Sequence, residues 1–174
     1  MQEILEILKY TLPSIVVMIT AFFMLKNFTS SEADKYKAQQ YLENNKQILP
    51  LRLQAYERVV LFLERISPEA LSVRLYVGEM DAGTLQKLMI QTIRKEYEHN
   101  ISQQVYVSDN AWNVVRNAKE SLINIINLAA TKVPAQEKSI LLSREILNFY
   151  NKADASPVQT AIHFIKSEMN KQFG

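Results

Sequence analysis

The sequence predicts an all-α protein with an N-terminal transmembrane helix, a helical neck and a bundle of about five to six helices. Three observations support this fold class. Apolar residues recur at three- and four-residue intervals over most of the chain, which is typical of amphipathic helices. Only 3 of the 174 residues are glycines, which leaves little for β-turns or phosphate-binding loops. A long run near the N-terminus also lacks any charged residue.

Composition excludes several classes of protein. The chain has no cysteine, so a disulfide scaffold and a thiolate metal site are excluded. The net charge is only +2, from 20 basic and 18 acidic residues. Such a balance produces no strong field to attract a polyanion, so no nucleic-acid partner is predicted.

The run without charge extends from Tyr10 to Leu25, between Lys9 and Lys26. At about 1.5 Å per residue its sixteen residues measure about 24 Å, against ~30 Å for the hydrocarbon core of a bilayer. Apolar residues before the run lengthen it, and the flanking lysines can reach the headgroups. The sequence therefore predicts a transmembrane anchor over residues 1–28. The predicted span residues are Tyr10, Leu12, Ile15, Val16, Val17, Ile19, Phe22, Phe23 and Leu25.

Two other interpretations explain this run less well. A cleavable signal peptide begins with basic residues, whereas Glu3 and Glu6 precede the first lysine here. A buried core helix or an in-plane amphipathic helix needs polar residues at helical intervals, and only Ser14 and Thr20 are polar between 12 and 25. More lysines follow the run than precede it, which predicts that the bulk of the chain faces the cytoplasm.

Residues 29–49 are polar and carry charges of nearly balanced sign. Good helix formers between Ala33 and Asn44 lack a wide apolar face, which favours a solvated helical neck. A disordered linker is the alternative interpretation of this segment.

Residues 50–174 have the pattern of a packed helical domain. An amphipathic helix is expected to start after Pro50 and to end near Ile66. The sequence Ser67-Pro68-Glu69 then begins a short helix, although residues 71–77 also alternate as in a strand. Further helices, begun by Asp81, Ser108 and Ser156-Pro157 among others, are predicted over about 81–104, 108–133, 135–152 and 157–172.

Candidates for catalysis or metal binding are few. Glu96 and His99 have the Glu-x-x-His spacing of di-iron helix bundles, but such sites need a second copy, and Thr160 stands where its glutamate would precede His163. The sequence also contains no nucleotide-binding or hydrolase motif. No catalytic residue, metal or cofactor is therefore predicted, and the chain is not expected to be an enzyme.

Polar residues on two of the predicted helices are candidates for directional contacts. They are suited either to a polar core between helices or to a partner protein, and internal contacts are favoured. Trp112, in the first turn of its helix, is expected to close the bundle end rather than to anchor a partner. The candidates are Glu57, Arg58, Glu64, Arg65, Glu96, His99, Asn100, Gln103, Gln104 and Trp112.

Two strings in the sequence are distinctive: PLRLQAYERVVLFLERISP at 50–68 and IRKEYEHNISQQVYVSDNAW at 93–112. They resemble an uncharacterised family of small single-span membrane proteins of Bacteroidota. That resemblance implies a Gram-negative inner-membrane protein. It implies no activity, and no catalytic residue is carried over from it.

These observations together predict a membrane-anchored helical module for protein–protein interaction, as an accessory or assembly subunit of a larger inner-membrane complex. The expected partners are the lipid bilayer and other membrane-protein subunits, with a second copy of the chain as a further candidate. A self-associating membrane scaffold is the alternative function. A membrane-bound enzyme with an unrecognised site is the third.

Overall fold

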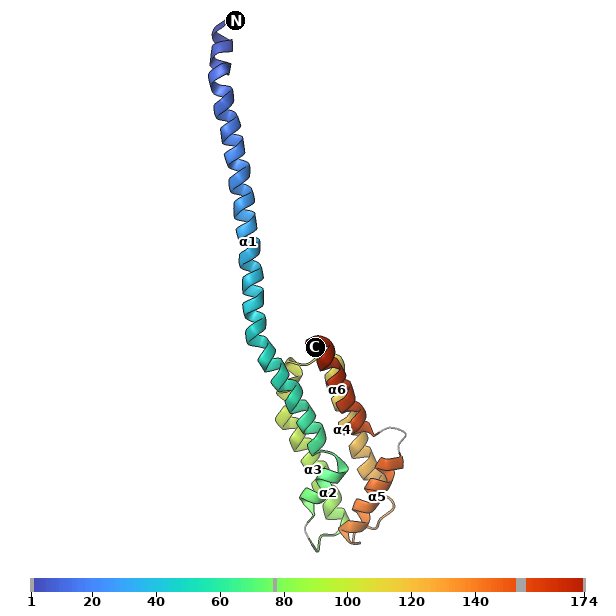
Figure 1. The fold of residues 1–174 in the computed structure, drawn as a ribbon. Helices are drawn as coiled ribbons and strands as arrows, with labels where there is room; N and C mark the ends of the chain where they lie inside the picture. Colours follow the sequence, from blue (N-terminus) through green and yellow to red (C-terminus); the bar gives the residue numbers. More distant parts are fainter. Residues whose placement is uncertain (1, 77, 153–155, 174) are drawn as a thin grey trace. The chain divides into compact units, whose positions relative to one another are not determined.

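The structure is a computed structural model that describes residues 2–76, 78–152 and 156–173; within the first helix, the side chains of 13–26, 35–37 and 39–65 are described. The described chain is helical without strands, which confirms the all-α part of the predicted fold class. Figure 1 shows its elements. They are α1 (Gln2–Arg65), α2 (Pro68–Leu75), α3 (Ala82–Asn100), the 3₁₀ helix η1 (Ile101–Val105), α4 (Asp109–Ala130), α5 (Ser139–Lys152) and α6 (Pro157–Phe173).

The chain divides into two compact units, residues 1–49 and residues 50–174, here called the N-terminal unit and the bundle unit. Helix α1 includes the predicted anchor, the neck and the helix expected after Pro50. The expected start after Pro50 is therefore wrong. A proline removes one helical hydrogen-bond donor. Helix-forming residues on both sides of Pro50 stabilise a helix that continues through it.

Residues 29–49 are helical, as the neck interpretation predicted. Among the residues that the structure describes, no helix is both long enough and apolar enough to cross a membrane. Tyr10 and Leu12, two of the predicted span residues, have side chains outside the described part.

The core of the bundle unit combines one face of α1 with the inner faces of the other helices. Helix α4 contacts α3, α5 and α6, and it lies beside α6 in Figure 1. The predicted stripe of α4 is buried at Ala111, Val115, Leu122 and Ile126 among others. From α1 the buried side chains are Ala55, Tyr56, Val59, Phe62, Leu63 and Ile66, all at most 2% exposed.

Three predicted helix starts are confirmed by their caps. The Ser67 hydroxyl accepts the backbone N–H of Ala70, the Asp81 carboxylate accepts that of Thr84 at 2.7 Å, and the Ser108 hydroxyl accepts that of Ala111. Each cap satisfies a donor that has no partner within the helix. Residues 71–75 lie in α2, so the helical interpretation of this stretch is correct there. Val77 lies outside the described residues.

Helix α3 ends at Asn100, before the expected end near Gln104. The buried Asn100 side chain donates from Nδ2 to the backbone carbonyl of Glu96 at 2.8 Å, one turn earlier. Asparagine competes in this way with helical hydrogen bonds. Residues 101–105 then form the tighter helix η1, in which Ile101 is 45% exposed.

Helix α5 starts at Ser139, not near Ala135 as expected. Residues 135–139 instead pair with the backbone before and at the start of α3: Ala82 N donates to Glu137 O at 2.7 Å and Ser139 N to Met80 O at 3.0 Å. The Gly83 backbone N–H donates to Ala135 O, and a Cβ at Gly83 would lie 3.1 Å from the Ala135 Cβ. This close approach favours glycine at position 83.

The packing of α4 predicts a sharp contrast between two leucines of one helix. Leu122 is fully buried and Leu128 is 54% exposed. Leu122→Ala is expected to lower the free energy of unfolding by about 2–5 kcal/mol because it leaves a cavity. The control Leu128→Ala should change it by no more than about 0.5 kcal/mol. Urea denaturation followed by circular dichroism measures both; equal losses would contradict the assigned core.

Candidate protein-interaction site

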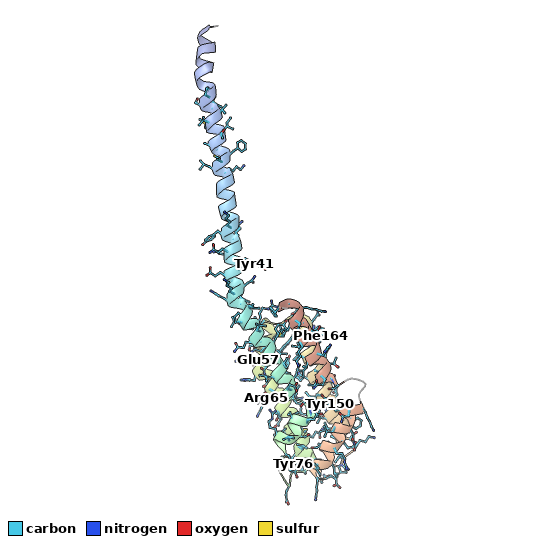
Figure 2. The ribbon with its side chains drawn as sticks, in the orientation of Figure 1. Tyr41, Glu57, Arg65, Tyr76, Tyr150 and Phe164 are labelled. Carbon is cyan, nitrogen blue, oxygen red and sulfur yellow. The ribbon has the colours of Figure 1, made fainter. Side chains whose placement is uncertain are left out.

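The polar candidates on α1 face outward for the most part. Glu57, Arg58 and Glu64 are exposed, and Figure 2 labels Glu57 and Arg65 along the same helix. Arg65 is exposed as well, with 58% of its side chain accessible, so all four side chains are in contact with solvent.

Glu96 brings together the ends of three helices. Its Oε1 lies 2.9 Å from Nη2 of Arg65 and 3.4 Å from Nη1 of Arg74, so α3 is linked to α1 and α2. Arg74 also donates from Nη2 to the backbone carbonyl of Arg65, at the C-terminal end of α1. This carboxylate is thus held by two guanidinium groups, while His99 is exposed. The described residues contain no cluster of three potential metal ligands.

The remaining sequence candidates lie at the end of α3 and the start of α4. Asn100 and Gln103 are buried, whereas Gln104 is exposed. Trp112 is 8% exposed and stacks on Tyr97, with ring centroids 5.4 Å apart. Lys119 Nζ lies 4.3 Å from the centroid of the Tyr97 ring, a cation–π distance. Trp112 is therefore packed within the bundle unit.

A second polar cluster, which the sequence analysis missed, surrounds Glu168 of α6. The Tyr56 hydroxyl donates to its Oε1 at 2.5 Å, and the Ser108 hydroxyl donates to its Oε2 at 2.6 Å. One turn later, Gln172 accepts from Arg52 Nη2 at 2.6 Å. Burial and the bond to Glu168 raise the pKa of Tyr56 to about 12. The cluster joins α1, α6 and the start of α4.

Sequence reasoning had little signal for this cluster. Tyr56 and Glu168 are 112 residues apart, and Ser108 and Glu168 are 60 apart. Nothing in a single sequence shows that a glutamate near the C-terminus accepts a hydrogen bond from the Tyr56 hydroxyl. Each pair stabilises the packing of helices that are distant along the chain.

An apolar groove lies between α2 and α5, and it is the candidate interaction site of the bundle unit. It encloses a cavity of about 890 Å³, within the range of ligand-binding pockets. Three of its lining side chains are strongly exposed: Val73 at 83%, Tyr76 at 54% and Ile140 at 55%. Tyr76 stands at the end of α2 in Figure 2. The lining residues are Ser72, Val73, Tyr76, Ile140, Leu141, Ser143, Arg144, Leu147 and Asn148.

Ser72 and Arg144 are two of the polar side chains that line the groove. The Ser72 hydroxyl oxygen is buried and has no hydrogen-bond partner among the described residues. Arg144 is exposed, and no ion pair to it occurs in the described part of the chain. Arg144, Leu141 and Asn148 also line an adjoining cavity of about 630 Å³. An apolar groove bordered by a cation that has no ion pair among the described residues is suited to an apolar segment that carries one carboxylate.

Fold and site define an all-α protein whose bundle unit presents an open apolar groove. The chain belongs to a family of unknown function, DUF7935, whose model matches residues 2–172. No curated protein matches the chain, and no solved structure matches it.

The Glu168 cluster predicts how stability depends on the hydroxyl of Tyr56. Tyr56→Phe leaves Glu168 without one donor and is expected to cost about 1–3 kcal/mol at pH 8. The raised pKa means that this contribution is complete below pH 10, the ordinary tyrosine value, and is lost as the pH rises towards 12. The difference in unfolding free energy between the two proteins should therefore be smaller at pH 11 than at pH 8. A difference that grows with pH would contradict the assignment.

Proposed function

We propose that the protein is a membrane-anchored interaction module. In this proposal residues 10–25 anchor it in a bacterial inner membrane, and the groove of the bundle unit binds a helical segment of a membrane-protein partner. The protein would act as an accessory or assembly subunit and not as an enzyme. The observation that carries the proposal is the apolar segment near the N-terminus.

This apolar segment has no polar face. From Pro13 to Leu25 every side chain is exposed, including Met18 at 68% and Met24 at 74%. A helix that is apolar on all sides is stable when lipid or protein surrounds it, but not in water. The uncharged run continues beyond the described side chains to Tyr10. Apolar exposure of this kind, within a run of sixteen uncharged residues, supports insertion in a bilayer.

A polar group inside the segment is already satisfied. The Thr20 hydroxyl donates to the backbone carbonyl of Val16 at 2.8 Å, one turn earlier. Threonine can therefore enter a hydrocarbon environment without an unpaired donor. Lysine counts on the two sides of the segment support a cytoplasmic bundle unit.

The partner of the groove is proposed from the chemistry of its lining. Val73, Tyr76 and Ile140 offer apolar surface, and Arg144 offers a cation without an ion pair in the described chain. An amphipathic helix with apolar residues three and four positions apart and one Asp or Glu beside them matches this lining. Anchoring raises the effective concentration of the groove near partners in the same membrane, so even a weak contact is populated.

The anchor predicts membrane attachment that depends on apolar residues within the span. The wild-type protein is expected to stay in the membrane pellet after alkaline carbonate extraction. Ile15→Arg with Ile19→Arg should move it to the supernatant, because each arginine at the centre of a span costs about 2.5–3.5 kcal/mol. The control, Gln39→Arg with Gln40→Arg, adds the same charge in the neck and should leave the protein in the pellet. Wild-type protein in the supernatant would contradict the anchor.

The groove predicts a cross-link that depends on its arginine. A photoreactive amino acid at Val73 is expected to capture a protein partner in native membranes, and peptide mapping should find an acidic residue within one helical turn of the captured site. The same group at the exposed Asn124 of α4 is the control and should capture nothing specific. Arg144→Glu should abolish the adduct at Val73. Capture only of lipid, equal adducts at both positions, or an adduct that survives Arg144→Glu would contradict the proposed partner.

A further inference from the structure

Helix α1 carries a second exposed apolar surface, which is distinct from residues 10–25, here called the anchor segment. It lies in the neck and consists of Tyr41, Leu42, Ile48 and Leu49, with Asn45 between them; we call these five residues the neck stripe. The four apolar side chains are 68%, 60%, 47% and 40% exposed. Helix surfaces of this kind are usually covered in the assembled protein.

The spacing of the neck stripe is that of a coiled coil. Tyr41 and Ile48 are seven residues apart, and so are Leu42 and Leu49. Asn45 follows Tyr41 by four positions and precedes Ile48 by three, which places these three residues in one seam of alternating core positions. The stripe therefore has the geometry to pack along a second helix.

The same seven-residue rows continue down α1 into the sequence of the bundle unit. There the positions that continue the rows of Tyr41 and Leu42 are buried in the core, so this register is used for helix packing, whereas Arg52, seven residues after Asn45, is only partly buried. In the neck the register persists and nothing among the described residues covers it. The buried positions of these two rows are Ala55 and Phe62, and Tyr56 and Leu63.

The side chain of Asn45 indicates which kind of partner fits the neck stripe. Its amide both donates and accepts, so it is satisfied by an identical amide opposite it. In a parallel pair of identical helices, equivalent core positions face each other, and a single asparagine there fixes the register. The opposite side of the neck, with Gln40, Glu43 and Gln47, is polar, so the apolar surface is confined to one side.

We propose that the neck stripe binds a second copy of this chain, in parallel and in register, with Asn45 opposite Asn45. This inference goes beyond the proposed function, because it concerns residues 41–49 and stands whether or not the groove binds a partner. A stripe that covers nine residues, little more than one heptad, makes a weak contact in isolation. Two chains anchored in the same membrane have a high effective concentration relative to each other, which favours even a weak contact between their neck stripes.

The absence of cysteine makes disulfide mapping a direct test, since each variant introduces the only thiol. Asn45→Cys and Ile48→Cys are made in the full-length chain, purified in mild detergent and oxidised under mild conditions. We expect both to form disulfide-linked dimers. Glu43→Cys and Gln47→Cys, on the polar side, are matched controls that should remain monomeric. All four positions are exposed, and circular dichroism verifies that each variant keeps its helix content.

A second pair of variants tests whether apolar contact holds the copies together. Tyr41→Lys with Ile48→Lys, added to Asn45→Cys, is expected to abolish the dimer. Gln40→Lys with Gln47→Lys adds the same charge on the polar side and should preserve it. Absence of the dimer at both 45 and 48, equal cross-linking at all four cysteine positions, or a dimer that survives the stripe lysines would overturn the proposal.

Discussion

The burial of one face of α1 in the bundle unit, from Ala55 to Leu63, is the contact on which the rest of the structure depends. Side chains such as Val59 and Leu63 are fully buried there. Polar contacts hold both ends of this segment: Tyr56 donates to Glu168 at one end, and Arg65 pairs with Glu96 at the other. These residues pack the C-terminal part of the long first helix into the core of the bundle unit.

Local signals in the sequence predicted much of this fold. Ser67, Asp81 and Ser108 were recognised as helix caps because each cap bonds to a residue three positions later. Long-range contacts gave no comparable signal. The donors to Glu168 lie 112 and 60 residues before it. The expected helical turn near Ala135 is a hydrogen-bonded turn that pairs with Ala82 through Glu137. The groove is formed by the packing of α2 against α5. The periodicity of apolar residues does not predict which helices pack together.

Three uncovered apolar surfaces differ in chemistry, and the difference suggests three kinds of contact. The anchor segment is apolar on all sides and contains a self-satisfied Thr20, which suits lipid. The groove is concave and is bordered by Arg144, which suits an acidic amphipathic helix. The neck stripe is narrow and contains a self-complementary Asn45, which suits an identical helix. One chain could thus hold a membrane, a copy of itself and a partner at separate sites.

Membrane anchoring is the central claim, and the location of the two chain ends tests it most directly. Alkaline phosphatase, active only outside the cytoplasm, is fused to the N-terminus, and green fluorescent protein, fluorescent only when folded inside, is fused to the C-terminus. The account predicts phosphatase activity from the first fusion and fluorescence at the cell membrane from the second. Both ends on the same side, or fluorescence spread evenly through the cytoplasm, would contradict it.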